Sequence, residues 1–280
     1  MPNSTEPNST EPDGTEPDRS VQQRPYLRYV ALGDSQTEGV GDGDDTVGLR
    51  GWADRLAEQL AVLEPGFQYA NLAVRGRLAG QVRAEQLGPA LELKPDLATV
   101  VAGVNDLLRP GFDPARTAGE LEAMFAALTE AGARVATVTF PDITRIVSLA
   151  KPLRPRILEI NDHIRAAAAR HGVVVAETAL PEASTDPRMW AADRLHASPL
   201  GHRCIAEAVA QALDLPGSSG SWADPLPPQA VATGVRATAA ELRWAAAFLG
   251  PWLARRVRGR SSGDGRSARR PALAPVVLRA

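Results

Sequence analysis

Short apolar runs alternate with longer stretches of helical periodicity from Tyr26 onward, and this alternation predicts the fold. Strands are expected at Tyr29–Gly33, Gln68–Leu72, Asp96–Ala102, Arg134–Phe140 and Val173–Ala176. Helices are expected at Trp52–Leu63, Leu78–Leu91, Pro114–Gly132, Pro155–His171 and Pro199–Leu213. Most of these strands are apolar along their whole length, as expected where helices cover both faces of a sheet. The pattern therefore predicts an α/β protein, a three-layer α/β/α sandwich around a mainly parallel five-stranded sheet.

The two ends of the chain differ from its middle. Residues 3–17 repeat polar, acidic and proline residues every five positions, and such a segment cannot bury enough apolar surface to order itself. After Leu215 the chain is rich in Gly, Ser and Pro, then shows a helical pattern at Ala237–Leu249 and ends in an arginine-rich segment. We expect three parts: a disordered acidic Pro/Thr/Glu arm at 1–25, one folded domain at 26–215, and at 216–280 a Pro/Gly linker, an appended helix and a disordered basic tail.

Composition limits the class of protein. With 280 residues, of which 44% are hydrophobic, the chain can bury one sizeable core. The first 28 residues lack the apolar run of about 7–15 residues that a signal peptide needs, and no stretch is long enough to span a bilayer. Cys204 is the single cysteine, which rules out an intramolecular disulfide or a cysteine-based metal cluster. These features predict a soluble, cytoplasmic protein.

Polar residues follow the predicted strands, at the sheet edge where ligands bind in folds of this class. Gly33-Asp34-Ser35 ends the first strand, and Gly76 lies in the loop after the second. Gly103-Val104-Asn105-Asp106 follows the third, and Asp193-Arg194-Leu195-His196 precedes the last helix. Taken singly, each segment also fits an ordinary turn or helix cap.

Three of these residues together fit nucleophilic catalysis. A serine hydroxyl becomes a good nucleophile when an imidazole takes its proton, and the imidazole needs a carboxylate to fix its tautomer. Ser35, His196 and Asp193 supply the three groups. The remaining histidines lie on or at the ends of predicted helices, where a surface or capping role is expected: His163, His171 and His202.

The four segments, in this order between Tyr29 and Leu213, resemble the sequence blocks of SGNH/GDSL hydrolases. The longer stretch GDSQTEGVGD at 33–42, with RGWADRLA at 50–57, resembles particularly the SGNH proteins often found in actinobacteria. The resemblance implies a flavodoxin-like SGNH hydrolase fold and a carboxylic ester hydrolase without metal or cofactor, acting on a small-molecule ester. It also implies roles for individual residues: Ser35 as nucleophile and backbone oxyanion donor, Gly76 as a second backbone donor, Asn105 as a side-chain donor, and Asp193 and His196 as the rest of the triad. Gln36 departs from the family motif, in which leucine is typical.

Two other hypotheses remain open. A non-catalytic protein could bind a membrane or nucleic acid through its C-terminal helix, which combines Trp244, Phe248 and Trp252 with several arginines. A helix packed on the domain is the simpler expectation; peripheral membrane contact stays open, and we do not expect a nucleic acid partner. A metal-dependent phosphodiesterase would use four possible ligands: Asp34, Asp106, Asp193 and His196. The sequence leaves the physiological substrate and the oligomeric state undetermined.

Overall fold

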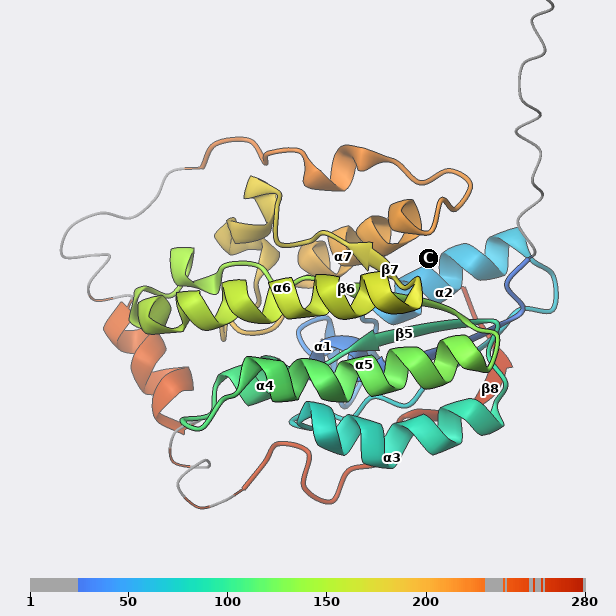
Figure 1. Cartoon of the computed structure of the whole chain (residues 1–280). Helices are drawn as coiled ribbons and strands as arrows, with labels where there is room; N and C mark the ends of the chain where they lie inside the picture. Colours follow the sequence, from blue (N-terminus) through green and yellow to red (C-terminus); the bar gives the residue numbers. More distant parts are fainter. Residues whose placement is uncertain are drawn as a thin grey trace, which may run out of the picture.

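The computed structural model describes residues 25–229, 239, 241–251, 254, 258 and 260–278. The acidic arm predicted for residues 1–25 falls almost entirely outside these residues. The described chain forms three layers, with a central sheet between two groups of helices (Figure 1). The predicted α/β/α sandwich is confirmed.

The central sheet has the order β7-β6-β5-β1-β4-β8 within the described residues. The strands are β1 (Arg28–Gly33), β4 (Gln68–Asn71), β5 (Leu97–Val101), β6 (Arg134–Val138), β7 (Val174–Ala176) and β8 (Arg270–Pro275). The first five are parallel, and in register Ala31 of β1 pairs with Asn71 of β4 and Thr99 of β5. Taken along the chain, the parallel strands follow the flavodoxin-like order 2-1-3-4-5.

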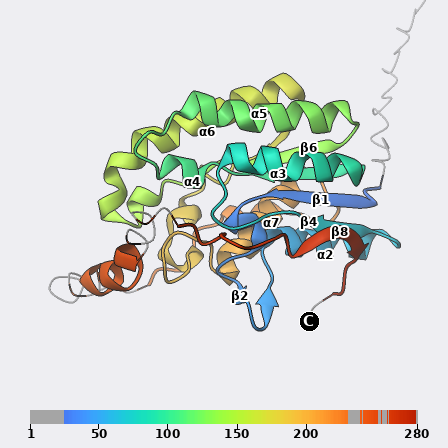
Figure 2. The same ribbon diagram turned by 90° about the horizontal axis from the view of Figure 1, so that it is seen from below.

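Helices cover both faces of this sheet (Figure 2). The helices α3 (Ala79–Glu92), α5 (Pro114–Glu130) and α6 (Arg154–His171) lie on one face, and α2 (Trp52–Leu63) and α7 (Pro199–Ala212) lie on the other. All five were predicted, with bounds that agree within one or two residues. Shorter elements join them: α1 (Ser35–Glu38), α4 (Val104–Leu107), the hairpin of β2 (Gly43–Asp44) and β3 (Gly48–Leu49), and the 3₁₀ helices η1 (Ile143–Arg145), η2 (Ser148–Leu153), η3 (Glu182–Thr185), η4 (Pro187–Met189) and η5 (Gly220–Ala223).

The core lies between the sheet and its helices. Trp52, Tyr29, Tyr69 and Phe125 are among its largest fully buried side chains. The rings of Tyr29 and Tyr69 stack with centroids 5.1 Å apart, and the Tyr29 hydroxyl hydrogen bonds to Thr99 Oγ1 at 2.8 Å. The polar end of a buried tyrosine is therefore satisfied inside the core, as burial requires.

The strand order places the predicted site residues together. The chain passes from β1 to β4 on one side and then returns to β5 on the other, so the loops after β1 and β5 diverge at the carboxyl edge. Such a switch point leaves a crevice where ligands bind in open α/β sheets. Ser35 follows β1 and Asn105 follows β5, so both residues lie at this point.

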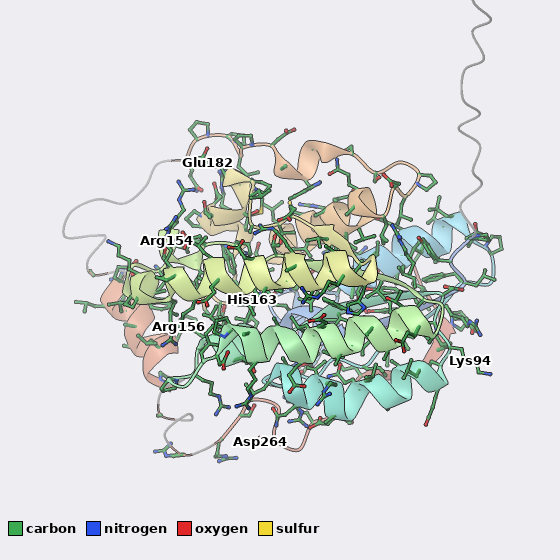
Figure 3. The ribbon with its side chains drawn as sticks, viewed as in Figure 1. Lys94, Arg154, Arg156, His163, Glu182 and Asp264 are labelled. Carbon is green, nitrogen blue, oxygen red and sulfur yellow. The ribbon has the colours of Figure 1, made fainter. Side chains whose placement is uncertain are left out.

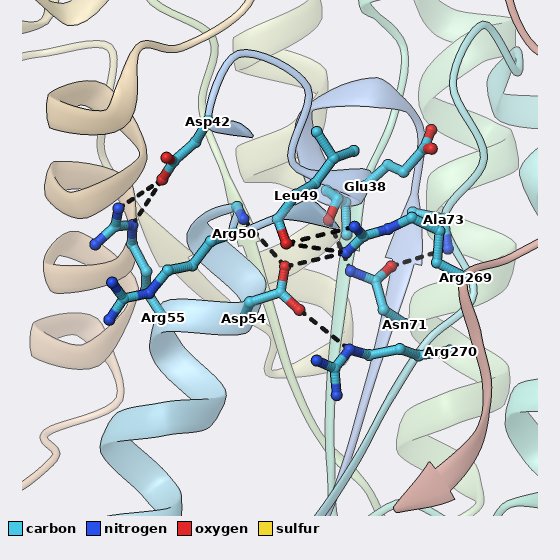
Figure 4. A network of polar contacts seen from close by, with 12 residues as sticks. Glu38, Asp42, Leu49, Arg50, Asp54, Arg55, Asn71, Ala73, Arg269 and Arg270 are labelled. Atoms are coloured by element: carbon cyan, nitrogen blue, oxygen red, sulfur yellow. Dashed lines mark hydrogen bonds and ion pairs between the residues drawn. The ribbon is translucent and has the colours of Figure 1, made fainter. Parts of the chain in front are cut away.

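The prediction of a disordered basic tail is wrong for residues 270–275. They form β8, which pairs antiparallel with β4 and makes a sixth strand where five were predicted. Figure 4 shows how the strand is anchored: Arg269 reaches the Leu49 carbonyl at 3.4 Å, and Arg269 and Arg270 both lie 3.5 Å from the buried Asp54 carboxylate. Two of the arginines that suggested a solvated tail, Arg269 and Arg270, are therefore ion-pair partners of a buried acid.

The segment between α7 and β8 is described in part. Trp222 of η5 packs against the core and donates from its indole N–H to Gln211 at 2.6 Å. The predicted appended helix is present at residues 241–251, with a π-helical turn, η6 (Ala245–Leu249), while 237 and 238 lie outside the described residues. In the part of the chain that the structure covers, no helix has the length and apolarity that crossing a bilayer requires.

Candidate active site

The structure brings Ser35, His196 and Asp193 into one hydrogen-bonded chain. Nε2 of His196 lies 2.8 Å from the Ser35 hydroxyl, and Nδ1 lies 2.6 Å from Asp193 Oδ2. Ser35 is 8% exposed, and the side chains of His196 and Asp193 are 15% and 29% exposed, so the serine end of the chain is the more shielded. A hydroxyl, an imidazole and a carboxylate are therefore linked in series by two short contacts.

The loop from Asp193 to His196, which we name the base loop, is folded by its own carboxylate. Asp193 Oδ1 accepts hydrogen bonds from the Leu195 and His196 N–H groups at 3.0 and 3.1 Å, the pattern of an Asx turn. Arg194 adopts a left-handed φ of 56°, which is strained for a residue with a side chain. One Asp193 oxygen thus shapes the loop while the other holds the imidazole.

Ser35 is positioned by tight packing at the end of β1. A β-carbon at Gly33 would lie 2.4 Å from the Val101 carbonyl oxygen, so only glycine fits between β1 and β5. The Gln86 amide from α3 bonds to both the N–H and the carbonyl of Gly33, at 2.8 and 2.9 Å. Asp34 caps α1 by accepting from the Gln36 N–H at 3.3 Å. These contacts place Ser35 on the first turn of α1.

Gly76 lies in the loop after β4 with a left-handed φ of 79°. The preceding Arg75 is fixed by Glu38 of α1, which accepts its backbone N–H at 2.7 Å and pairs with its guanidinium at 2.8 Å. A β-carbon at Gly76 would lie 2.1 Å from Ser261 Oγ, in the segment that leads to β8. The loop that carries Gly76 is therefore held between α1 and the C-terminal segment.

Asn105 and Asp106 of α4 link this loop to Asp34. The Asn105 amide nitrogen donates to Asp34 Oδ2 and to the Arg77 carbonyl, both at 3.1 Å. Asp106 Oδ2 accepts from the Ala79 N–H at 2.9 Å at the start of α3. Asn105 is therefore close to the loop of Gly76, and Asp106 has the capping role that an Asx residue often takes.

The carboxylates of the site differ in their tendency to ionise. Burial raises the pKa of Asp34 to about 7, against hydrogen bonds from the Gln36 N–H and Asn105 and the charge of His196 that lower it. Burial also raises the pKa of Asp106. Burial acts in the same direction on Asp193, but the hydrogen bond and charge of His196 outweigh it, so the pKa of Asp193 lies below its ordinary value. Asp193 is therefore the carboxylate that stays ionised beside His196.

An apolar cavity of about 90 Å³ lies next to these residues. Its lining includes Gln36 of α1, Val104 of α4, Phe140 after β6, Leu195 and Ala197 on either side of His196, and Ile205 of α7. Because Gln36 adjoins Ser35, and Leu195 and Ala197 adjoin His196, the cavity borders both Ser35 and His196. Cys204 also lines it, and burial raises the pKa of its thiol.

The other histidines make their contacts outside the chain of Ser35, His196 and Asp193. His163 is on α6 in front of the sheet (Figure 3), and His171 at the end of the same helix lies 3.2 Å from Glu122. His202 is fully buried, which corrects the expectation of a surface or capping role. Its Nδ1 accepts from the Trp52 N–H, and its Nε2 donates to the Val40 carbonyl, each at 3.1 Å. It is a core residue that joins α7 to the start of α2 and the loop after α1.

Sequence reasoning missed the residues that support the site. Gln36, Glu38 and Gln86 each bind backbone groups of a site loop. Gln36 was noticed as a departure from a motif, and Glu38 follows Ser35 by three residues, but neither position shows which backbone atoms it meets. Their partners are peptide groups, which carry no signal in the sequence.

The ligand set for the metal hypothesis does not assemble. Among the residues that the structure covers, no group of three or more His, Cys, Asp and Glu could hold a metal ion. The four residues considered as ligands each bind protein groups instead, as given above: Asp34, Asp106, Asp193 and His196.

Comparison with solved structures finds chains of the same fold. TesA is 25% identical over 66% of this chain and 97% of its own, with a TM-score of 0.56. LAE5, an alpha/beta hydrolase enzyme from the metagenome of Lake Arreo in Spain, is 22% identical over 67% of this chain and 95% of its own, with a TM-score of 0.57. Axe2, an acetylxylan esterase from Geobacillus stearothermophilus, is 18% identical over 71% of this chain and 96% of its own, with a TM-score of 0.57. The two likenesses below 25% identity show a shared fold.

No functionally curated protein shows significant sequence similarity to the chain. The model of the GDSL-like Lipase/Acylhydrolase family, however, matches residues 31–204, which is more than half of the chain and includes every residue of the candidate site. The chain therefore belongs to the GDSL-like Lipase/Acylhydrolase family, within the SGNH/GDSL hydrolase superfamily.

Proposed function

We propose that this protein is a serine-dependent carboxylic ester hydrolase with Ser35 as nucleophile, His196 as base and Asp193 as the residue that orients the base. The observation that carries the proposal is the continuous chain of short contacts, 2.8 Å from Ser35 Oγ to His196 Nε2 and 2.6 Å from His196 Nδ1 to Asp193 Oδ2. Membership of a family of lipases and acylhydrolases supports the same class of reaction.

Each group has one task in the reaction. Ser35 Oγ attacks the acyl carbon while its proton passes to His196 Nε2, and ionised Asp193 stabilises the imidazolium through Nδ1–H. The bond to the leaving alcohol then breaks, and the alcohol takes the proton from Nε2. Water attacks the acyl-enzyme and gives a proton to Nε2, after which the acid leaves and Ser35 regains its proton.

The negative charge on the tetrahedral intermediate needs donors, which we assign to the N–H groups of Ser35 and Gly76 and to the Asn105 amide. Within the described chain, neither of the two N–H groups donates to another protein atom. The Asn105 amide nitrogen is oriented by Asp34 and the Arg77 carbonyl, so an oxyanion has to share one of its hydrogens. Sharing weakens the hydrogen bond from Asn105 to the oxyanion, but the two protein partners fix the plane of the Asn105 amide.

The apolar cavity beside the triad supports an assignment of acyl length. A cavity of ~150 Å³ can bind benzene, so the cavity of about 90 Å³ has room for fewer carbons. We assign it to a short acyl chain of about four carbons, which would lie between the base loop and the end of β6.

The test is hydrolysis of p-nitrophenyl esters from acetyl to palmitoyl, together with labelling by a fluorophosphonate probe. Wild-type protein is expected to hydrolyse and label, with the highest kcat/KM near butyryl, and Ser35→Ala is expected to lose both activities. Ser221→Ala on exposed η5 is the matched control and should behave as wild type. Wild-type protein that neither hydrolyses nor labels, or a Ser35→Ala variant that stays active, would refute the serine mechanism.

The binding hypothesis for the C-terminal helix has less support. The Arg194 guanidinium lies over the Trp244 ring, with Cζ 4.9 Å from the ring centroid, and Glu241 pairs with the same arginine at 2.7 Å. Part of the face proposed for a membrane thus contacts the base loop. Trp252, Arg255 and Arg256, which that hypothesis also uses, lie outside the described residues.

A further inference from the structure

Gln36 connects the helix of Ser35 to the base loop. Its side-chain Nε2 donates to the Leu195 carbonyl at 3.0 Å, and its Oε1 accepts from the Ala197 N–H at 3.2 Å. These backbone groups belong to the residues immediately before and after His196. A single neutral amide therefore holds the peptide chain on both sides of the imidazole.

The base loop requires such a support. Arg194 has a left-handed φ of 56°, a conformation that persists only when surrounding contacts impose it. Asp193 fixes the inner part of the loop by accepting from the Leu195 and His196 N–H groups. The Leu195 carbonyl accepts its hydrogen bond from Gln36 Nε2, and the Ala197 N–H donates its own to Gln36 Oε1.

The two hydrogen bonds of Gln36 are partly shielded from solvent. Ala197 is 4% exposed, and Gln36, Leu195 and Ala197 all line the apolar cavity. A shielded peptide group that loses its partner is destabilised, so the loop would move to find another partner if the amide were removed. Movement of the loop changes the distance between Ser35 Oγ and His196 Nε2.

We propose that Gln36 is a positioning residue that sets the place of His196 relative to Ser35. Leucine, which is typical at this position of the motif, has neither donor nor acceptor and cannot make this bridge. The inference rests on the proposed function, because it assigns Gln36 to the geometry of that same triad. A misplacement of about 1 Å at reacting groups can cost about 10²-fold in rate, so the effect should be visible in kcat.

The experiment compares Gln36→Leu, which keeps the size and removes both bonds, with Gln36→Asn, which keeps the amide on a shorter side chain that cannot span the gap. The control is Gln59→Leu on α2, because Gln59 makes its side-chain bond to the Glu207 carboxylate of α7 and not to the base loop. The readouts are kcat and KM for p-nitrophenyl butyrate, and the low-field NMR signal of the proton between His196 Nδ1 and Asp193.

We expect both Gln36 variants to lower kcat by about 10–100-fold with KM within about twofold, and to broaden or lose the low-field signal. Gln59→Leu should match wild type in both. If Gln36→Leu keeps the wild-type kcat and signal, or changes KM alone as a mere wall of the cavity would, the inference is wrong. Failure of the proposed function is a different result: wild-type protein then neither hydrolyses nor labels, and the NMR comparison alone decides whether Gln36 positions His196.

Discussion

His202 makes the stability of the fold depend on pH in a way that can be calculated. The imidazole is 0% exposed, and its two hydrogen bonds require a proton on Nε2 and none on Nδ1. Burial lowers the pKa of His202 to about 4 from an ordinary value of 6.5, although the hydrogen bond to the Val40 carbonyl and nearby Asp42 favour the charged form. Protonation of Nδ1 would break the bond from the Trp52 N–H.

Whether stability rises or falls with pH depends on whether the folded or the unfolded state binds the proton more tightly. In the unfolded chain His202 binds a proton near pH 6.5, and in the folded protein only near pH 4, so the free energy of unfolding falls as pH falls between these values. The shift corresponds to about 3 kcal/mol in total, of which about 2 kcal/mol is lost between pH 7 and pH 5. Asp34 acts in the opposite direction, because its pKa of about 7 means that the folded carboxyl binds its proton first.

A variant isolates the contribution of His202 from that of Asp34. His202→Gln keeps one donor and one acceptor but does not titrate, so urea unfolding of wild type and variant should be compared at pH 7 and pH 5. The stability advantage of wild type over the variant should shrink by about 2 kcal/mol at the lower pH. His163→Gln on α6 is the control for the same change outside the core. Parallel losses in wild type and His202→Gln would refute the reasoning.

Three further changes test the site and the C-terminal strand. Asp193→Asn should lower kcat by about 10³–10⁴-fold, because His196 loses the carboxylate that fixes its tautomer; ester turnover near the wild-type rate would contradict this. Asn105→Ala should lower turnover by about 10²–10³-fold with an unchanged circular dichroism spectrum, and full activity would remove Asn105 from the oxyanion hole. Arg270→Ala should lower the free energy of unfolding by about 1–2 kcal/mol in urea, because the Asp54 carboxylate is buried beside it; an unchanged midpoint would show that the ion pair adds nothing.

The long helices and the parallel strands could be predicted because burial requires apolar residues at regular spacings along the sequence. The five parallel strands and the five long helices appear where apolar runs and helical spacing place them. The helices α1 and α4 were missed because four residues are too few to show a period. Both carry site residues, so the elements hardest to predict are those that hold Ser35 and Asn105.

The strand β8 was missed for a different reason. Its sequence has Pro271 and Pro275 and follows several arginines, which is typical of a solvated tail. Proline is compatible with an edge strand, where one side has no partner, and most of this strand is exposed. The strand exists because β4 offers an open edge and Asp54 attracts Arg270, and neither condition can be seen within the segment itself.

Sequence motifs indicate the reacting groups of the proposed site, but they do not indicate the side chains that hold its loops in place. Ser35, Asp193 and His196, the proposed triad, could be singled out in the sequence because the proposed chemistry demands those residue types. The supports act on peptide groups: Gln86 on Gly33, Glu38 on Arg75, and Gln36 on both sides of His196. A backbone group is the same in every residue, so side chains of different types can hold a loop in place, as Gln36 does here. The proposed triad therefore requires particular residue types, whereas a supporting side chain needs only sufficient length and hydrogen-bonding groups. For this reason, a substitution of a supporting residue should change the rate of the reaction without changing its mechanism.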